Sequence, residues 1–424
     1  MSLKKPKKYY VKWSLLSLLV GVLVGIMTII FLMSLNFLTE LRNMNSSIIW
    51  ALPLCGFFIG WVYYKYGQSV SGGSNLIIDE IHNPQKVIPL RMVPLIICGT
   101  LLTHLFGGSA GREGSAVQMG ASISDQMSAI FKLSPDDRKT LLVIGAGAGF
   151  GSAIGVPLAG AVFGMEIIFI GRLKLFAFFE CLVASYTAYY TANFLSAPHS
   201  HFELSHVDEI SLKTLFLVIL AGAFFGLAAN IFSMITHKIE SIRLRYIDYP
   251  PLKPFLAGTA LVLLYYIEGS YKYAGLGIPI IQDAFIHLSS FSQPALKIFF
   301  TAITVGGGFK GGEFVPLVFI GSTLGSALSK ILSLSIGLLA ALGFAAVFAG
   351  ASNAPLACSL MAIELFGLKI APYSFLACYV SYYFSGHHGI YKSQKIYINK
   401  HLKVKNHLFW VKAKTILFIE RIRK

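Results

Sequence analysis

The sequence is short of charged residues, which make up 13% of its 424 positions. Soluble globular proteins carry about 25%, and a soluble chain of this length would need about two or three domains with polar surfaces. The shortage excludes a soluble enzyme, a nucleic-acid-binding module and a disordered chain. The chain has instead 55% hydrophobic residues and 40 glycines, which is typical of a polytopic helical membrane protein.

Acidic residues are the scarcer charged class, with 19 Asp and Glu against 35 Lys and Arg and a net charge of +16. Basic ends on an apolar chain indicate topology rather than a nucleic-acid partner, because Lys and Arg near span ends favour the cytoplasmic side. We expect basic cytoplasmic ends over residues 1–12 and 393–424 and a location in the inner (plasma) membrane. The residues that mark the ends are Lys4, Lys5, Lys7, Lys8 and Lys12, then Lys400, Lys403, Lys405, Lys412, Lys414, Arg421, Arg423 and Lys424.

Cysteine is also rare: the five cysteines lie far apart in apolar surroundings, as small hydrophobic residues of helices do. Three histidines, His199, His201 and His206, fall in a polar segment over 199–212. A metal site is the alternative there, but a solvated loop between spans is favoured. We predict neither a metal nor a cofactor.

The first long apolar run covers residues 13–37. This run is too long for a signal-peptide core and long enough to span a bilayer. Several later runs are short and bounded by Gly or Pro. Backbone breaks at membrane depth only where protein or a water-filled cavity covers it, and transporters present broken helix ends to ions. The further runs are 48–64, 92–106, 141–170, 175–195, 215–235, 255–267, 295–309, 317–332, 334–348, 354–366 and 371–384.

The chain repeats itself at a spacing of 198 residues, as from Pro157 to Pro355 and from Glu166 to Glu364. Such repeats indicate homologous halves packed about a pseudo-two-fold axis. We predict halves at about 13–237 and 254–392, separated by a basic cytoplasmic segment over 238–253. Residues 107–170 and 305–368 should have opposite orientations in the membrane.

Three glycine-rich patches interrupt the apolar runs, over residues 69–84, 107–120 and 306–321; we call them the first, second and third patch. Each patch predicts a glycine turn followed by an apolar helix. Backbone N–H groups and the macrodipole make such a helix N-terminus an anion site. The alternative is close helix packing through small residues.

Glu113 lies in the turn of the second patch, beside Arg112. A carboxylate there competes with an anion for the same N–H groups, so it would block the site when ionised and vacate it when protonated. We predict that Glu113 is both gate and proton carrier. The alternative is a structural ion pair with Arg112 or an N-terminal cap.

Three other glutamates are open to two interpretations. Glu166 and Glu364 occupy matching repeat positions, which favours a structural role on the backbone N–H groups of a neighbouring broken helix. Lys310 and Glu313 of the third patch would form either a local ion pair or part of an anion path.

At these patches the chain resembles the CLC family of chloride channels and anion/proton antiporters. The segments that carry the resemblance are GREGSAVQMG from Gly111, GGEFVP from Gly311, GSNLI from Gly73, and the repeated VPLAGAVFGMEI and APLACSLMAIEL. The resemblance covers roughly residues 13–391. It implies an all-α polytopic membrane protein of two inverted repeats of tilted and broken helices, a homodimer, and no enzyme activity. It also implies an anion site at Gly73, Ser74, Asn75, Gly111, Arg112, Gly114, Gly312, Glu313, Phe314, Val315 and Tyr391, gated by Glu113.

The branch most similar is that of the bacterial fluoride/proton antiporters. Ser115, Lys310, Glu313 and Ile167 follow its pattern, Ile167 standing where chloride antiporters carry an inner acidic residue, whereas Ser74 and Val315 depart from it. The resemblance implies export of fluoride in exchange for protons across the lipid bilayer. A voltage-gated-type chloride channel or a chloride/proton antiporter is the alternative. Fluoride would need strong hydrogen-bond donors, for which Ser74, Asn75 and Tyr391 are candidates.

Overall fold

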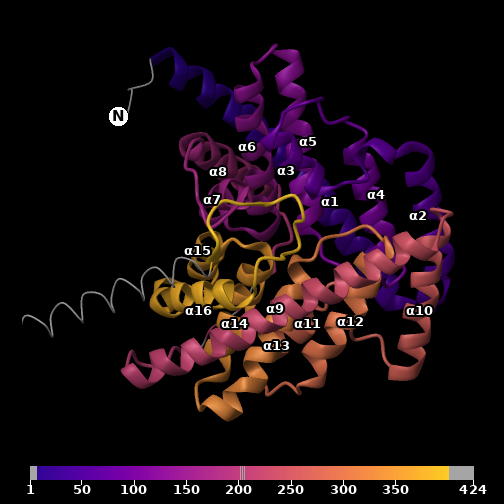
Figure 1. Cartoon of the computed structure of the whole chain (residues 1–424), viewed down its shortest axis with the longest axis vertical. Coiled ribbons are helices and arrows are strands. Elements are labelled where there is room, and N and C mark those ends of the chain that lie inside the picture. Colours follow the sequence, from indigo (N-terminus) through magenta and orange to yellow (C-terminus); the bar gives the residue numbers. More distant parts are fainter. Residues whose placement is uncertain (1–6, 201, 203, 205, 401–424) are drawn as a thin grey trace, which may run out of the picture.

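The computed structural model describes residues 7–200, 202, 204 and 206–400, and it is almost entirely helical (Figure 1). The first eight α-helices occupy mainly the upper part of that view. A two-residue strand, β1, follows α7. The elements are α1 (Lys7–Met44), η1 (Ser46–Ala51), α2 (Leu52–Tyr66), η2 (Gln68–Val70), α3 (Ser74–His82), α4 (Met92–Leu105), α5 (Glu113–Ile130), α6 (Pro135–Ile154), α7 (Pro157–Glu166), β1 (Phe169–Ile170) and α8 (Phe178–Phe194).

The next eight helices lie mainly in the lower part of the view (Figure 1). The closing strand β2 pairs in parallel with β1, so the chain after α16 returns to the end of α7. The elements are α9 (Leu212–Tyr246), α10 (Leu252–Glu268), α11 (Ile278–Asp283), α12 (Ser292–Gly307), α13 (Phe314–Leu332), α14 (Ile336–Ser352), α15 (Pro355–Phe366), η3 (Leu368–Ile370), α16 (Ala371–Phe384) and β2 (Lys395–Ile396).

Gly and Pro break the apolar runs where the sequence places them together. The run over 141–170 divides into α6 and α7 at Gly155, whose φ of +94° lies in the left-handed region that favours glycine. Pro157 then opens α7 at a position where no helical N–H is lost. The same order recurs at Asn353 (φ +58°) and Pro355 between α14 and α15.

Glycines also bring helices into backbone contact. A Cβ on Gly145 of α6 would overlap the carbonyl of Gly120 on α5, and one on Gly343 of α14 would overlap the carbonyl of Gly321 on α13. Helices that cannot use the hydrophobic effect inside lipid associate through such small residues. The glycines that end the second and third patches, Gly120 and Gly321, therefore serve close helix packing, which is the alternative interpretation of these patches.

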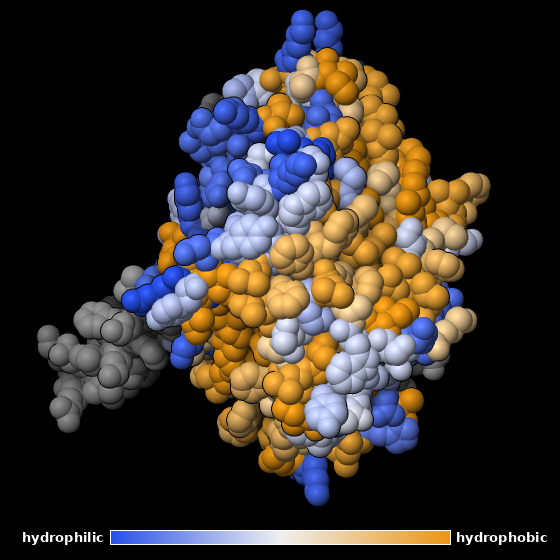
Figure 2. All heavy atoms as spheres, turned by 90° about the vertical axis from the view of Figure 1, so that its right-hand side faces the viewer, coloured by the Kyte–Doolittle hydropathy of each residue, from blue (hydrophilic) through white to orange (hydrophobic). Residues whose placement is uncertain are grey.

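Four helical segments in the described part of the chain are long and apolar enough to cross a membrane: Lys7–Met44, Ser46–Tyr66, Leu212–Tyr246 and Phe314–Leu332. The other helices are shorter or more polar. Figure 2 shows apolar side chains over most of one face, with hydrophilic side chains gathered at its upper left and lower end. The four long apolar helices, the shorter helices and the apolar surface agree with a membrane protein built partly from broken helices.

The repeat relates all of the α-helices. Each helix from α1 to α8 has a counterpart at the same place in the series α9–α16, at nearly the same sequence separation. The end of α7 contacts the start of α15, since the Glu166 carboxylate accepts the Leu356 N–H (3.0 Å). The end of α15 contacts the start of α7 through Glu364 and the Leu158 N–H (2.9 Å). These two repeat-related helices therefore run antiparallel, in agreement with the predicted inversion.

The expected boundary between the halves falls inside a helix. Residue 237 lies within α9, which continues to Tyr246 and matches α1 in the repeat. Arg243 and Arg245 stand in the last turn of α9, where cations favour the helix end, so these charges mark a helix terminus rather than a loop. The element order places the division between α8 and α9.

The two basic ends also differ from the expected tails. Lys7, Lys8 and Lys12 belong to α1, and residues 395–400 fold back onto the membrane part, with Lys400 only 5% exposed. The Lys400 ammonium donates to the Tyr382 carbonyl (2.8 Å) just before the end of α16. The remaining basic residues of the ends, within 1–6 and 401–424, lie outside the described residues.

Candidate anion site

The second and third patches are joined by a short antiparallel bridge. The Gly111 N–H donates to the Gly312 carbonyl (2.6 Å), and the Gly312 N–H donates to the Gly111 carbonyl (2.8 Å). A Cβ on Gly312 would lie 2.6 Å from the Gly114 nitrogen, so only glycine allows this approach. The bridge holds the N-termini of α5 and α13 side by side, as the sequence predicted for an anion site.

Glu113 is the first residue of α5 and its side chain is 2% exposed. Its carboxylate accepts the Arg112 backbone N–H (3.2 Å) and lies 3.3 Å from Arg112 Nε. The ion pair that the sequence left as an alternative is therefore present in this conformation. Burial penalises the ionised carboxyl, while Arg112 and the helix N-terminus stabilise it.

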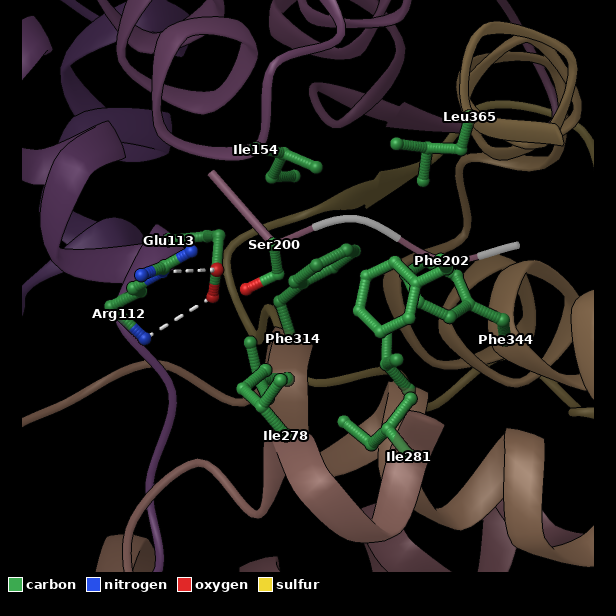
Figure 3. A pocket seen from close by; sticks show the side chains of 12 residues that line it. Arg112, Glu113, Ile154, Ser200, Phe202, Ile278, Ile281, Phe314, Phe344 and Leu365 are labelled. Carbon is green, nitrogen blue, oxygen red and sulfur yellow. Dashed lines mark hydrogen bonds and ion pairs between the residues drawn. The ribbon is translucent and has the colours of Figure 1, made fainter. Parts of the chain in front are cut away.

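A small cavity of about 20 Å³ adjoins Glu113, with room for about one water molecule. We call it the Glu113 cavity. Figure 3 shows Arg112 and Glu113 on one side of it and apolar side chains opposite. Phe202, which precedes α9, packs against Phe344 with ring centroids 5.1 Å apart and helps to close the cavity. Its lining residues are Arg112, Glu113, Ile154, Ser200, Phe202, Ile278, Ile281, Phe314, Val315, Val318, Phe344 and Leu365.

A larger cavity of about 410 Å³ contacts the third patch from another direction. We call it the Tyr391 cavity. It gathers residues of the first patch, the third patch, α9 and the segment after α16. The predicted site residues that line it are Gly73, Ser74, Asn75, Glu313 and Tyr391.

Three side-chain donors in the Tyr391 cavity are available to a ligand. The Ser74 hydroxyl oxygen accepts from Gln118 (3.4 Å), and the Asn75 amide oxygen accepts the Ser393 N–H (3.1 Å). In both side chains an acceptor is occupied while the donor has no partner among the described residues. The Tyr391 hydroxyl lines the same cavity and has no hydrogen-bond partner among the described residues. An anion is the ligand class that such donors suit.

Lys310 and Glu313 do not form an ion pair in the part of the chain that the structure describes, so that alternative is wrong. The Lys310 ammonium lies 4.0 Å from the centre of the Tyr63 ring, a cation–π geometry. Both residues line the Tyr391 cavity. Lys310 is therefore a partly buried lysine that lines the same cavity as Ser74 and Tyr391.

The remaining predicted residues lie near the bridge. Phe314 and Val315 line the Glu113 cavity, and Gly114 packs against Gly312, where its Cβ would be 3.0 Å from the neighbouring Cα. The predicted residues are thus brought together: they line two cavities that both contact the third patch, or they lie at the bridge, as Gly111, Gly114 and Gly312 do. Ile167 is 1% exposed and apolar, so it offers no proton site at the end of α7.

Several residues of the Tyr391 cavity were missed in the sequence. His237 and Glu240 stand three positions apart in α9, and their polarity within an apolar helix was the available signal. For Tyr63, Gln118 and Lys392 the sequence held no signal of a place in the cavity. Among the described residues no cluster of metal-ligating side chains is found; His199 instead contacts the Ser152 carbonyl (2.8 Å), and His201 lies outside them.

Two relatives have sequences similar to this chain. A "Chloride/fluoride channel protein" of Pseudomonas syringae pv. tomato is 44% identical over 405 residues, which cover 93% of this chain and 88% of that protein. The "H(+)/Cl(-) exchange transporter ClcA" of Vibrio vulnificus is 27% identical over 385 residues, or 82% of this chain and 81% of that protein.

Solved structures show the same likeness. A CLC-type fluoride/proton antiporter superposes with a TM-score of 0.89 at 33% identity, covering 93% of this chain and 100% of that one. A slow cyanobacterial Cl−/H+ antiporter, with a TM-score of 0.79 at 22% identity over 92% and 97% of the chains, shares the fold. The sequence profile described as "Voltage gated chloride channel" matches residues 55–386. The chain is thus a member of the CLC family, the family of the voltage-gated chloride channels, and it has that family's all-α membrane fold.

Proposed function

We propose that the protein exports fluoride in exchange for protons, with Glu113 as gate and proton carrier. The names of its relatives support this: one is called a chloride/fluoride channel protein and another a fluoride/proton antiporter. The observation that carries the proposal is the pair of side-chain donors on Asn75 and Tyr391, which have no partner among the described residues and line the cavity beside the third patch. Fluoride holds water strongly, and these donors replace its hydration.

Glu113 works as a gate because it uses the same donors as an anion. When ionised, its carboxylate takes the Arg112 N–H and the positive end of α5. When protonated, it loses most of that attraction and leaves the position to the anion. Each time fluoride replaces the carboxylate, the protonated Glu113 side chain leaves the site and carries one proton with it.

Glu313 suits fluoride more than chloride. Its carboxyl borders the Tyr391 cavity, where an ionised group would repel an anion. A protonated carboxyl donates a hydrogen bond instead, and fluoride is the stronger acceptor of the two halides. The wider partner set of the proposal is fluoride or chloride, protons, the lipid bilayer and a second copy of the chain in a homodimer.

Orientation follows from the charges around the larger cavity. Arg243 and Lys392 line the Tyr391 cavity, and Arg245 stands in the same last turn of α9. Because basic residues favour the cytoplasmic side, we place the Tyr391 cavity and both termini in the cytoplasm, and the Glu113 cavity toward the outside. The membrane is then the inner (plasma) membrane.

A chloride channel or chloride/proton antiporter is the second candidate. Ser74 and Val315 favour it, since Val315 adds no side-chain donor at the Glu113 cavity. Purified protein in liposomes loaded with fluoride or chloride distinguishes the candidates, with anion efflux and proton uptake recorded together. Fluoride efflux that drives proton uptake supports the proposal, whereas equal halide fluxes without proton movement support the channel.

A further inference from the structure

Charged and titratable side chains surround the mouth of the Tyr391 cavity. His237, Glu240 and Arg243 come from successive turns of α9, and Lys392 comes from the segment after α16. Glu240 is the centre of the group, because its carboxylate pairs with Lys392 and lies 3.9 Å from Arg243 Nη2. The mechanism above uses none of the four.

The two ring nitrogens of His237 have different surroundings. Nε2 lies 2.8 Å from the Gly389 carbonyl, which can only accept, so Nε2 carries a hydrogen. Nδ1 is buried without a hydrogen-bond partner in the described part of the chain, and it lies 3.8 Å from a Glu240 carboxylate oxygen. In the neutral ring the Nδ1 lone pair faces this carboxylate unfavourably, whereas in the imidazolium an N–H faces it.

Other charges keep this proton exchangeable. Glu240 favours the imidazolium, while the cations that share the carboxylate and the cavity oppose it. Glu313 adds a second carboxyl to the lining of the cavity. The charged groups that face His237 from α9, from the segment after α16 and from the third patch are Glu240, Arg243, Lys392, Lys310 and Glu313.

His237 is also linked to the anion site by position. Gly389, its hydrogen-bond partner, stands two residues before Tyr391, and Ser393 then binds Asn75. Glu313 lines the same cavity of about 410 Å³, which is large enough for a chain of water molecules. A proton can therefore pass between Glu313 and His237 without crossing the apolar packing around Ile167.

We propose that His237, held by Gly389 and Glu240, is the cytoplasmic proton-exchange group of this transporter. In this step the proton that Glu113 carries passes to the Glu313 carboxylate. The resulting Glu313 carboxyl gives it through cavity water to Nδ1 of the neutral imidazole and returns to a carboxylate, and the imidazolium then releases the proton to the cytoplasm. The inference rests on the proposed fluoride/proton exchange and adds the residue through which protons leave.

The test uses the full-length protein in liposomes, with fluoride efflux and proton flux measured across an internal pH of about 5.5 to 8. His237→Gln keeps a donor for Gly389 but cannot titrate. We expect fluoride efflux to persist, proton flux per fluoride to fall at least about tenfold, and the slowing of wild-type exchange at acidic internal pH to disappear. His287→Gln is the matched control, because the exposed His287 pairs with Asp283 (2.6 Å) and lines neither cavity.

A second variant covers the case in which His237→Gln does not reconstitute. Glu240→Gln removes the charge that favours the imidazolium, so the acidic inhibition of wild type should move to lower internal pH. Unchanged coupling and an unchanged pH profile in either variant would overturn the role of His237. A wild type that moves fluoride without protons would overturn the proposed exchange itself, and the proton role of His237 with it.

Discussion

Glu166 and Glu364 stabilise each other's helices by an exchange of carboxylates across the repeat. Glu166 accepts the N–H groups of Leu356 and Ala357 at the start of α15 (3.0 and 2.7 Å). Glu364 accepts the corresponding pair at the start of α7 (2.9 and 2.7 Å). The structural role that the sequence favoured for both residues is confirmed. Each broken helix begins with its free N–H groups satisfied by the other half.

Replacing either carboxylate should therefore destabilise the fold without acting on the anion site. Glu166→Ala leaves two buried N–H groups unpaired, and we expect it to lower the free energy of unfolding by about 2–3 kcal/mol. Glu364→Ala should lower it to a similar extent. Thermal unfolding in detergent measures the effect, with the exposed Glu40→Ala as control. Unfolding midpoints equal to wild type would contradict the capping role.

Glu113→Gln should abolish or uncouple proton-linked transport, because a neutral amide carries no proton and no longer competes as an anion. The measurement is proton movement against a fluoride gradient in liposomes. Glu180→Gln is a matched control, since Glu180 is another buried glutamate, bound by the Tyr9 hydroxyl (2.6 Å) and outside both cavities. Proton pumping by Glu113→Gln at the wild-type level would refute the gate.

Fluoride should be preferred over chloride, and Glu313→Ala should weaken that preference because it removes a donor from the Tyr391 cavity. Ser74→Met should keep or sharpen the preference, since Ser74 is one of the two departures from the fluoride pattern. Parallel fluoride and chloride efflux assays give the ratio. Equal fluxes in wild type, unchanged in Glu313→Ala, would return the assignment to the chloride branch.

The proposed orientation can be tested with single cysteines. Cys98 is the exposed cysteine among the five, so a Cys98→Ser background removes the main competing thiol. Lys392→Cys, at the mouth of the Tyr391 cavity, should resist a membrane-impermeant thiol reagent in intact cells and react in inverted vesicles. Labelling of intact cells would place the Tyr391 cavity outside.

Local signals made much of the fold predictable. The pairing of Gly155 with Pro157 marks a helix break, and the spacing of 198 residues predicts a second copy of that break at Asn353 and Pro355. The family, the all-α fold and the clustering of the three patches followed from such signals. The functional roles of the predicted site residues stay predictions.

Contacts across long sequence separations were not predictable. The charges of α9 suggested a loop because basic residues mark both helix ends and loops, and the sequence alone does not separate the two. The link of His237 to Gly389 joins positions 152 residues apart, and Asn75 reaches Ser393 over a still longer separation. No periodicity or motif in the sequence connects these residues. They come into contact because the segment after α16 returns over the Tyr391 cavity.

The bridge between Gly111 and Gly312 has a mechanical consequence. It joins the two repeats beside Glu113, and the exchange between Glu166 and Glu364 joins them again at α7 and α15. A rocking of one half against the other would break the two hydrogen bonds of the bridge and the four N–H bonds to Glu166 and Glu364 on each turnover. On the proposed mechanism, this frame stays fixed during exchange, and opening and closing fall to the rotation of side chains, that of Glu113 above all.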